Sequence, residues 1–470
     1  MKKLKKNILR AAFVLCALFA LLLGYGAYTV SVNSNRWFSS TLNVYARQKR
    51  QDVIPGRILD RSGVVLASSD GEGERVYPDD EALRRATVHA VGSSAFNMKS
   101  SAEYFYAAYL YGSRLSFPER LGYALKGEKY KGDDVVLTID SALNAYAASL
   151  FPQDKKGAAV VMNYRTGEVL CLLSFPNFDP RNTSAAPSGA SINRVTQSLM
   201  APGSTFKIVT YASVLENMTD YQSRTFICGG QLQAGNRIIT DAGTDLEAGK
   251  ITQHGALTLR EAFLKSCNNT FAQIALELGD AALRRTAESF GFNDNFLFRD
   301  LVVENSRYPT SNRTDGEIAW TGAGQSALAV SPLHMCMVAS SIANDGTMME
   351  PWMILEARTA SGGTRASFSA RQYRRPLNAA QAAVLKDAMR GVVTGGTGTA
   401  ANLSGVKVCG KTGSAEIDGQ EQTNAWFLGF LDEPASPYAL AVVVEDAGGG
   451  GSVSAPIARQ IFSWLLSHGY

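Results

Sequence analysis

A serine and a lysine three positions apart could act as a nucleophile and its base. Pro202 and Gly203 precede Ser204 and Lys207, and Pro-Gly before an apolar run predicts the start of a helix. Residues three apart share one face of a helix, so these side chains would be neighbours. A serine hydroxyl becomes a nucleophile when a base takes its proton, and a buried lysine can be neutral enough to take it. By itself, the Ser-x-x-Lys pattern is weak evidence for a catalytic site, because it occurs by chance in most long chains and also fits two solvent-exposed side chains on one helix.

A second short motif, Ser266-Cys267-Asn268, stands at the start of a predicted helix. A hydroxyl can relay a proton, and an amide can both donate to and accept from a peptide-like substrate. Capping of the helix N-terminus by Ser266 or Asn268 is the simpler explanation of this motif when it is taken by itself.

A third motif, Gly410-Lys411-Thr412-Gly413-Ser414, follows a strand predicted at residues 406–408. A lysine and hydroxyls at a strand edge can hold a carboxylate, and glycine lets a substrate backbone approach closely. Gly405 with Gly410 and Lys411 also fits the spacing of a phosphate-binding loop. That alternative is excluded because residues 406–409 are mostly apolar and strand-like, where a glycine-rich cradle and a helix would be needed.

The N-terminal segment predicts a membrane anchor. Residues 11–30 contain no charge and no proline, and twenty helical residues span about 30 Å, the thickness of a bilayer core. The basic residues before them predict a cytoplasmic stub at 1–10 and export of the remainder. A cleaved signal peptide is the alternative, although its apolar region usually runs only about 7–15 residues.

Composition excludes several other classes of protein. The net charge of +4 comes from the N-terminus, because five of the 46 Lys and Arg lie in the first ten residues, which contain no acid. The near-neutral remainder excludes a nucleic-acid-binding domain. The six cysteines lack metal or redox spacing and the four histidines are dispersed, so we expect no metal site, no disulfide scaffold and buried apolar cysteines.

The elements expected to position the motifs predict an α+β fold. Apolar alternation predicts a hairpin over 57–66, and helices are predicted to dominate 203–290 and 331–344, with loops at 361–370. Further strands are predicted at 135–139, 158–162, 169–174, 425–430 and 438–444, and further helices at 141–150 and 455–467. Helices between early and late strands predict one mainly antiparallel sheet flanked by helices.

Taken together, the order Ser-x-x-Lys, Ser-x-Asn, Lys-Thr-Gly resembles the signature of penicillin-recognising serine acyl enzymes. The chain is similar to class B penicillin-binding proteins, which are membrane-anchored peptidoglycan D,D-transpeptidases. Residues 57–63, 136–140, 175–180, 322–326 and 425–430 also match this class. Ser326 and Ser414 depart from the glycine and threonine that the family often has there.

The resemblance implies a domain organisation. Residues 1–10 would be a cytoplasmic stub, 11–30 a transmembrane anchor, 31–133 a small non-catalytic pedestal domain and 134–470 the transpeptidase domain. The pedestal segment is too short for the glycosyltransferase domain of class A members. The expected location is the bacterial cell membrane, with one span and the catalytic domain outside.

The resemblance also implies the chemistry. Ser204 would attack the D-Ala-D-Ala end of a peptidoglycan stem peptide, and β-lactams would acylate the same serine without any cofactor. The implied catalytic residues are Ser204, Lys207, Ser266, Asn268 and Lys411, and the implied substrate-binding residues are Thr412, Gly413 and Ser414. The implied partner is a polytopic glycosyltransferase.

Two alternative functions fit parts of this resemblance. A D,D-carboxypeptidase or β-lactamase would pass the acyl group to water. A non-catalytic cell-wall scaffold or β-lactam sensor would keep only the fold, but the intact motifs argue against a decayed site, and ten cytoplasmic residues cannot form an output module.

Overall fold

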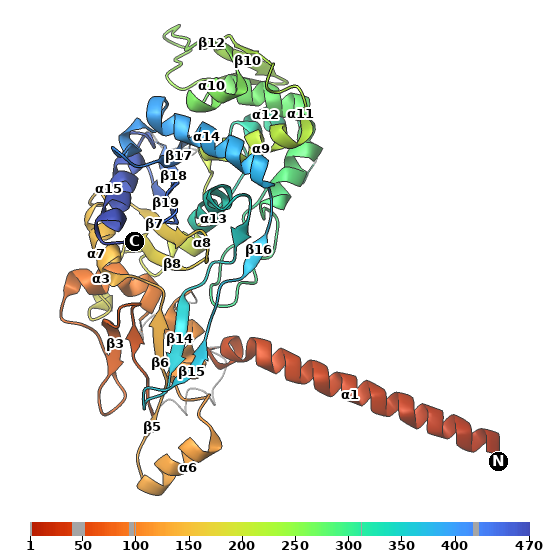
Figure 1. Cartoon of the computed structure of the whole chain (residues 1–470), viewed down its shortest axis with the longest axis vertical. Coiled ribbons are helices and arrows are strands. Elements are labelled where there is room, and N and C mark those ends of the chain that lie inside the picture. The colour runs from red at the N-terminus through yellow and green to blue at the C-terminus, as the bar shows by residue number, and fades with distance from the viewer. Residues whose placement is uncertain (1, 40–51, 94–97, 99, 312, 417–422) are drawn as a thin grey trace.

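One long helix projects from an elongated body of two large sheets and the helices around them (Figure 1). The computed structural model describes residues 2–39, 52–93, 98, 100–311, 313–416 and 423–470. The predicted anchor and the three short motifs all lie within these residues.

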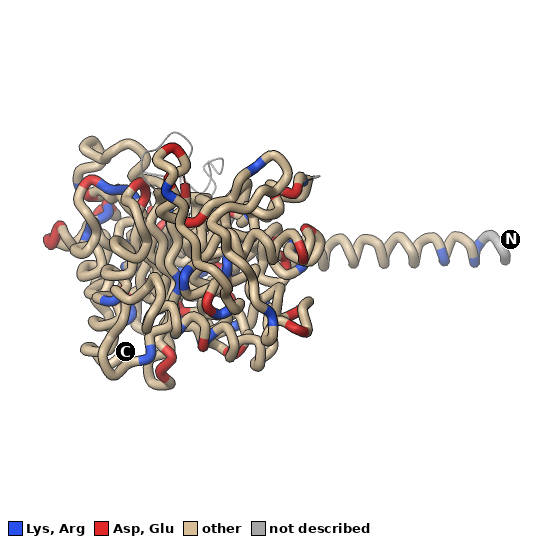
Figure 2. Tube along the Cα trace, turned by 90° about the horizontal axis from the view of Figure 1, so that it is seen from above, with Lys and Arg blue, Asp and Glu red and all other residues tan. Residues whose placement is uncertain are grey.

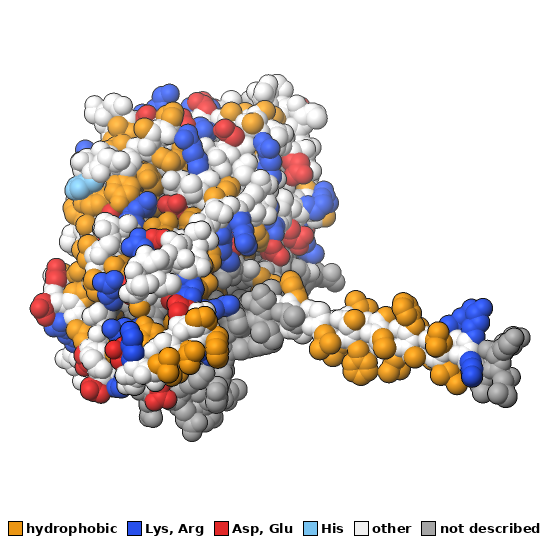
Figure 3. All heavy atoms as spheres, turned by 60° about the horizontal axis from the view of Figure 1, so that its bottom comes forward, with side chains coloured by type: hydrophobic (Ala, Val, Ile, Leu, Met, Phe, Trp, Pro, Cys, Tyr) orange, Lys and Arg blue, Asp and Glu red, His pale blue; other side chains and the backbone are white. Residues whose placement is uncertain are grey.

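The projecting helix α1 (Lys2–Ser39) contains the predicted anchor. Its segment Lys5–Gly26 has a mean hydropathy of 2.3 and no buried residue, and it is the one helix long and apolar enough to cross a membrane within the described ranges. Apolar side chains cover the projecting part and basic ones lie near its tip (Figure 3), whereas the other charges are spread over the body (Figure 2). A lone apolar helix with satisfied backbone hydrogen bonds suits a bilayer.

A six-stranded sheet forms the end of the body near α1 (Figure 1). Its strands, in spatial order, are β15 (Thr364–Ser367), β14 (Ile354–Arg358), β6 (Asp134–Leu137), β2 (Ile58–Leu59), β3 (Val65–Ser69) and β4 (Arg75–Val76). The predicted hairpin is the antiparallel pair β2–β3, with Ile58 opposite Ala67. The prediction of loops throughout 361–370 is wrong, because the backbone of β15 pairs with β14.

The same sheet joins segments distant in sequence. Strand β6 pairs in parallel with β2 and antiparallel with β14. The sheet therefore takes strands from both sides of the predicted boundary between residues 133 and 134, and that boundary stays a prediction.

The segment between β4 and β6 is mostly helical. Its helices are α3 (Glu81–Val91), α4 (Ala102–Phe105), α5 (Ala107–Leu110) and α6 (Phe117–Lys126), and β5 (Tyr130–Lys131) pairs with β1 (Val53–Ile54). Helix α3 begins where the Asp80 side chain accepts a hydrogen bond from the Leu83 amide. It packs against α7 (Ser141–Ser149) and so joins this segment to the larger sheet region.

The second large sheet has five strands, and every neighbouring pair is antiparallel. In spatial order they are β17 (Val408–Ala415), β18 (Asn424–Leu431), β19 (Tyr438–Val444), β7 (Gly157–Asn163) and β8 (Val169–Phe175). Together with the flanking helices, this sheet confirms the predicted α+β class.

Helices cover both faces of this sheet, which explains its unbroken apolar runs. Along β19, Ala439, Ala441 and Val443 belong to the core that includes α13 (Pro332–Ala343). The alternate residues, such as Val442, pack with α15 (Ser454–Ser467). Since successive side chains of a strand point to opposite faces and both faces are covered, the residues on each face must be apolar.

The third region lies at the far end of the body and contains both helices and short strands (Figure 1). Its helices are α9 (Lys207–Asn217), α10 (Leu259–Leu264), α11 (Asn268–Ser289) and α12 (Asp315–Gly322). Its strands are β9 (Phe226–Cys228), β10 (Gln231–Ala234), β11 (Arg237–Thr240) and β12 (Gly255–Leu257). The prediction of a mainly helical 203–290 is therefore wrong for 226–257, where strands of three or four residues are too short to show a period.

The remaining elements connect these regions. They are α8 (Arg194–Gln197), β13 (Met348–Met349), β16 (Gln372–Arg374) and α14 (Ala379–Gly395), with 3-10 turns η1 (Thr183–Ala185), η2 (Gly203–Phe206) and η3 (Thr399–Ala401).

Asn144 provides a test of how α3, α7 and β8 are joined. Its buried amide donates to the carbonyls of Ala86 (3.0 Å) and Leu172 (3.3 Å) and accepts from the Leu172 amide (3.2 Å). We expect Asn144→Ala to lower the free energy of unfolding by about 1–3 kcal/mol, because buried backbone groups lose their partners. Denaturant unfolding of the purified chain checks this. The matched control, Ser149→Ala on the exposed face of α7, should stay near the wild type, and equal values for the two variants would contradict the prediction.

Candidate functional site

The first motif forms a tight turn that enters a helix. Ser204 lies in η2 and Lys207 is the first residue of α9, so the lysine side chain lies directly beside the serine. Gly203 has φ +55°, and a Cβ there would lie 2.8 Å from the Ser414 carbonyl oxygen. Glycine is needed at this position because the turn packs against the backbone of β17.

Lys207 is buried with its amine at the centre of the site. Its Nζ donates to the Ser266 carbonyl (2.6 Å) and to Asn268 Oδ1 (2.7 Å), and it lies 3.0 Å from Ser204 Oγ. A neutral amine has two hydrogens and one lone pair. The two acceptors take the hydrogens, which leaves the lone pair for the Ser204 hydroxyl.

The electrostatics favour this neutral form. Burial lowers the pKa of Lys207 to about 7, and the nearby Cys267 and Asp241 oppose that shift. Removal of the ammonium from water disfavours its charge. An amine with a pKa near neutrality can exist as a base at physiological pH.

The second motif stands where a short loop enters α11. Ser266 has φ +57°, Cys267 is the N-cap residue and Asn268 is the first residue of the helix. The Asn268 amide is held at both ends, since its Oδ1 accepts from Lys207 and its Nδ2 donates to the Thr240 carbonyl (2.9 Å). The cap is Cys267 rather than Ser266 or Asn268, so the capping alternative does not account for either residue.

The third motif is part of strand β17 rather than a turn after a strand. The strand was expected at 406–408, but β17 begins at Val408 and pairs with β18 as far as Ala415. The strand therefore contains the whole motif. Buried Lys411 donates to Ser266 Oγ (2.9 Å) and to the Thr412 carbonyl (3.0 Å). Burial and the charge of Lys207 lower its pKa well below the usual range for lysine.

These segments enclose a cleft of about 550 Å³. Six of the eight residues singled out in the sequence line it, namely Ser204, Ser266, Asn268, Thr412, Gly413 and Ser414. Lys207 and Lys411 lie beneath them and are fully buried. The structure thus brings all eight residues together, although the three motifs are far apart in the sequence.

Two further residues line the cleft that the sequence analysis did not assign to the site. Thr397 shares a hydrogen bond with Thr412 through their hydroxyls, and the Gln325 amide approaches the Ser414 carbonyl at 3.5 Å. Gly324 belongs to the segment 322–326, which matched the family, and it has φ +98°. A Cβ on this residue would lie 1.7 Å from the Gly203 carbonyl oxygen. Glycine is needed at this position because the segment packs against the backbone of the nucleophile turn.

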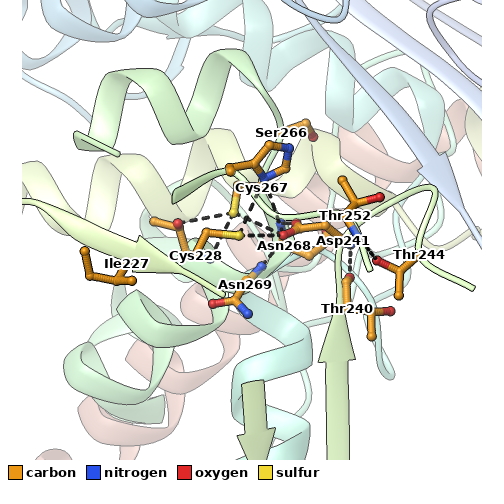
Figure 4. Close-up of polar contacts among 12 residues, drawn as sticks. Ile227, Cys228, Thr240, Asp241, Thr244, Thr252, Ser266, Cys267, Asn268 and Asn269 are labelled. Carbon is orange, nitrogen blue, oxygen red and sulfur yellow. Dashed lines mark hydrogen bonds and ion pairs between the residues drawn. The ribbon is translucent and has the colours of Figure 1, made fainter. Parts of the chain in front are cut away.

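A second cluster of polar side chains lies next to Asn268 (Figure 4). Cys228, Asp241, His254 and Cys267 place one ligand atom each within 4.8 Å of the others. The sequence analysis missed this group, because its members stand on separate segments without the short spacing of common metal motifs.

Comparisons with known proteins agree with this geometry. Residues 157–463 match the family described as the penicillin binding protein transpeptidase domain. The chain is 30% identical over 468 residues to the peptidoglycan D,D-transpeptidase PbpA of Mycolicibacterium smegmatis, with 91% of each protein covered.

Solved structures show the same fold. Penicillin-binding protein A from M. tuberculosis, as an imipenem acyl-enzyme complex, matches with a TM-score of 0.77 and 27% identity, covering 89% of this chain and 100% of that one. A D,D-transpeptidase domain from Eggerthella lenta matches with a TM-score of 0.75 and 30% identity, covering 88% and 98%. The chain therefore belongs to the penicillin-binding protein transpeptidase family, as a class B member.

Proposed function

We propose that this protein is a peptidoglycan D,D-transpeptidase that works through an acyl-enzyme on Ser204. The observation that supports it most is the buried Lys207 amine, 3.0 Å from Ser204 Oγ and with a pKa of about 7. The M. smegmatis relative bears the same activity in its name, and the M. tuberculosis relative forms an acyl-enzyme with imipenem.

In the first step, Lys207 takes the proton of Ser204, and Oγ attacks the carbonyl between the two terminal D-alanines. The backbone N–H groups of Ser204 and Ser414 stabilise the oxyanion, and one such donor is typically worth about 2.7–4 kcal/mol. When the C–N bond breaks, the acyl group remains on Ser204 as an ester.

Ser266 is placed to deliver a proton to the leaving D-alanine. Its Oγ lies 3.3 Å from the Lys207 amine and 2.9 Å from that of Lys411, so the hydroxyl connects both lysines. The proton that Lys207 accepted can reach the departing amine through this hydroxyl. An amine of a neighbouring stem peptide then attacks the ester, forms the cross-linking amide and frees Ser204.

The rest of the site positions the substrate. The Thr412 and Ser414 hydroxyls, with Lys411, hold the terminal carboxylate of the stem peptide, and Gly413 lets its backbone lie along β17. Asn268 orients the donor peptide. β-Lactams enter as mimics of D-Ala-D-Ala and acylate Ser204.

We further propose that residues 31–133 form a non-catalytic pedestal and 134–470 the transpeptidase domain, with the basic residues of 1–10 in the cytoplasm. A polytopic glycosyltransferase would contact the anchor and the pedestal. We expect such a protein to co-purify with the full chain in mild detergent, and its repeated absence from the purified chain would count against this partner.

The acyl-enzyme has a direct test. Intact-mass spectrometry of the protein with benzylpenicillin should show a persistent adduct of one drug mass that is lost in Ser204→Ala. The matched control Ser223→Ala, an exposed serine outside the cleft, should keep the adduct. An adduct that disappears as the drug is consumed would indicate a hydrolase, and no adduct would favour the scaffold alternative.

The pKa of Lys207 predicts the pH dependence of acylation. Since burial lowers this pKa to about 7, the neutral base is depleted below pH 7 and predominates above it. We expect the rate constant for benzylpenicillin acylation to rise through pH 7 and level off at higher pH, when measured between about pH 5.5 and 8.5.

Lys207→Arg should show no acylation at any of these pH values, because guanidinium stays charged. The matched control Lys386→Arg, an ion-paired lysine outside the site, should keep the wild-type profile. A flat wild-type profile would contradict the assignment of Lys207 as the base.

A further inference from the structure

We propose that Phe263 and Phe271 form an aromatic platform that governs the charges of the two buried lysines beneath the cleft. The ring of Phe271 stabilises the ammonium that Lys207 becomes when it takes the serine proton. The ring of Phe263 stabilises the ammonium of Lys411, which holds the carboxylate of the substrate. Both phenylalanines are therefore positioning residues for the reaction, and this inference rests on the proposed function.

Each buried amine lies over the face of one phenylalanine ring. Lys207 Nζ is 5.6 Å from the centroid of the Phe271 ring, and Lys411 Nζ is 5.4 Å from the centroid of the Phe263 ring. A cation within about 6 Å of a ring centroid is attracted by the negative face of the ring, most strongly where water is excluded. All four side chains are fully buried, so the attraction acts here under the conditions that strengthen it.

Neither lysine has a carboxylate to balance its charge. In the part of the chain that the structure describes, Lys129 and Lys386 are the lysines that form ion pairs. The hydrogen-bond partners of the Lys207 and Lys411 amines are backbone carbonyls, hydroxyls and one amide oxygen, all of them neutral. A buried charge without a counter-ion is costly, so the aromatic faces supply part of the stabilisation that a carboxylate would provide.

The platform is part of the packing around the segment that contacts both amines. Phe263 lies in α10 and Phe271 in the first turn of α11, so the two rings flank the Ser266–Asn268 loop along the chain. Their centroids are 6.2 Å apart, and Tyr211 of α9 packs edge-on against Phe263 at 5.3 Å. These contacts fix the ring faces in the orientation that the two amines meet.

The other titratable groups around the amines act on the same charges. Burial lowers the pKa of Lys207 to about 7, whereas Cys267 and Asp241 raise it. Burial and then the charge of Lys207 lower the pKa of Lys411 well below the usual range. His254 lies 3.4 Å from the Asp241 carboxylate and pairs with it rather than with an amine. All of these groups stay in place when only a ring is changed, so a ring variant isolates the effect of the platform.

The role of Phe271 is tested through the pH profile of acylation in the full chain purified in detergent. We expect Phe271→Leu to lower the midpoint of the benzylpenicillin profile by about 0.5–1 pH unit, because the Lys207 ammonium loses a stabilising contact. Di- and trifluorophenylalanine at position 271 should lower it stepwise, since fluorine withdraws negative charge from the ring face and largely keeps the ring shape. The matched control Phe298→Leu, a buried ring packed on Phe296 outside the cleft, should keep the wild-type midpoint.

The role of Phe263 has a different readout, because the Lys411 ammonium acts on the carboxylate of the ligand. We expect Phe263→Leu to lower the second-order rate constant for acylation by benzylpenicillin about 3–10-fold, through weaker binding before the acylation step. The methyl ester of benzylpenicillin has no free carboxylate, so its slower acylation should be the same in Phe263→Leu and the wild type. An equal loss with both compounds would overturn the role of Phe263 and indicate packing alone.

Failure of this inference and failure of the proposed function give different results. A wild type that acylates, together with fluorinated chains whose midpoint is unchanged, would overturn the role of Phe271. A wild type that forms no adduct would contradict the proposed function. The charge of Lys207 is then followed through the carbon-13 resonance of its ε-carbon, assigned by its loss in Lys207→Arg. That titration midpoint should still fall with fluorination, and an unchanged midpoint would overturn the inference there as well.

Discussion

The site depends on one buried amine. Lys207 is out of contact with water, and its position is defined by oxygens from η2, the Ser266 loop and α11. Burial makes the charged form unfavourable, so the amine is useful as a base only while the surrounding packing stays closed. Any shift of α11 relative to α9 would change both the partners of this amine and its pKa.

The five-stranded sheet provides the rigid side of that arrangement. Both faces of β18 and β19 are buried under helices, so β17 is held in a fixed register beside β18. The Trp426 indole on β18 donates to the Ala201 carbonyl just before η2, which joins the nucleophile turn to the sheet. Gly203 and Gly324 permit the close backbone contacts that complete this side of the cleft.

The far side of the cleft is built from short elements with little apolar burial of their own. Strands β10 and β11 are largely exposed, yet the end of β11 provides the Thr240 and Asp241 contacts to Asn268. The two sides of the site are therefore held differently, by extensive hydrophobic packing on one side and by hydrogen bonds to Asn268 on the other.

The sequence by itself determined the apolar N-terminal helix, the α+β class and the three motifs, because apolar length, strand alternation and short motifs are local properties of the chain. It did not reveal strands β9 to β12 or β15, because strands this short depend on the neighbouring strand that pairs with them more than on their own residues. Nor did it reveal the grouping of Cys228, Asp241, His254 and Cys267. Only the tertiary structure decided which distant side chains meet, how deeply Lys207 is buried and therefore what its pKa is, because proximity and desolvation arise from packing between segments far apart in the chain.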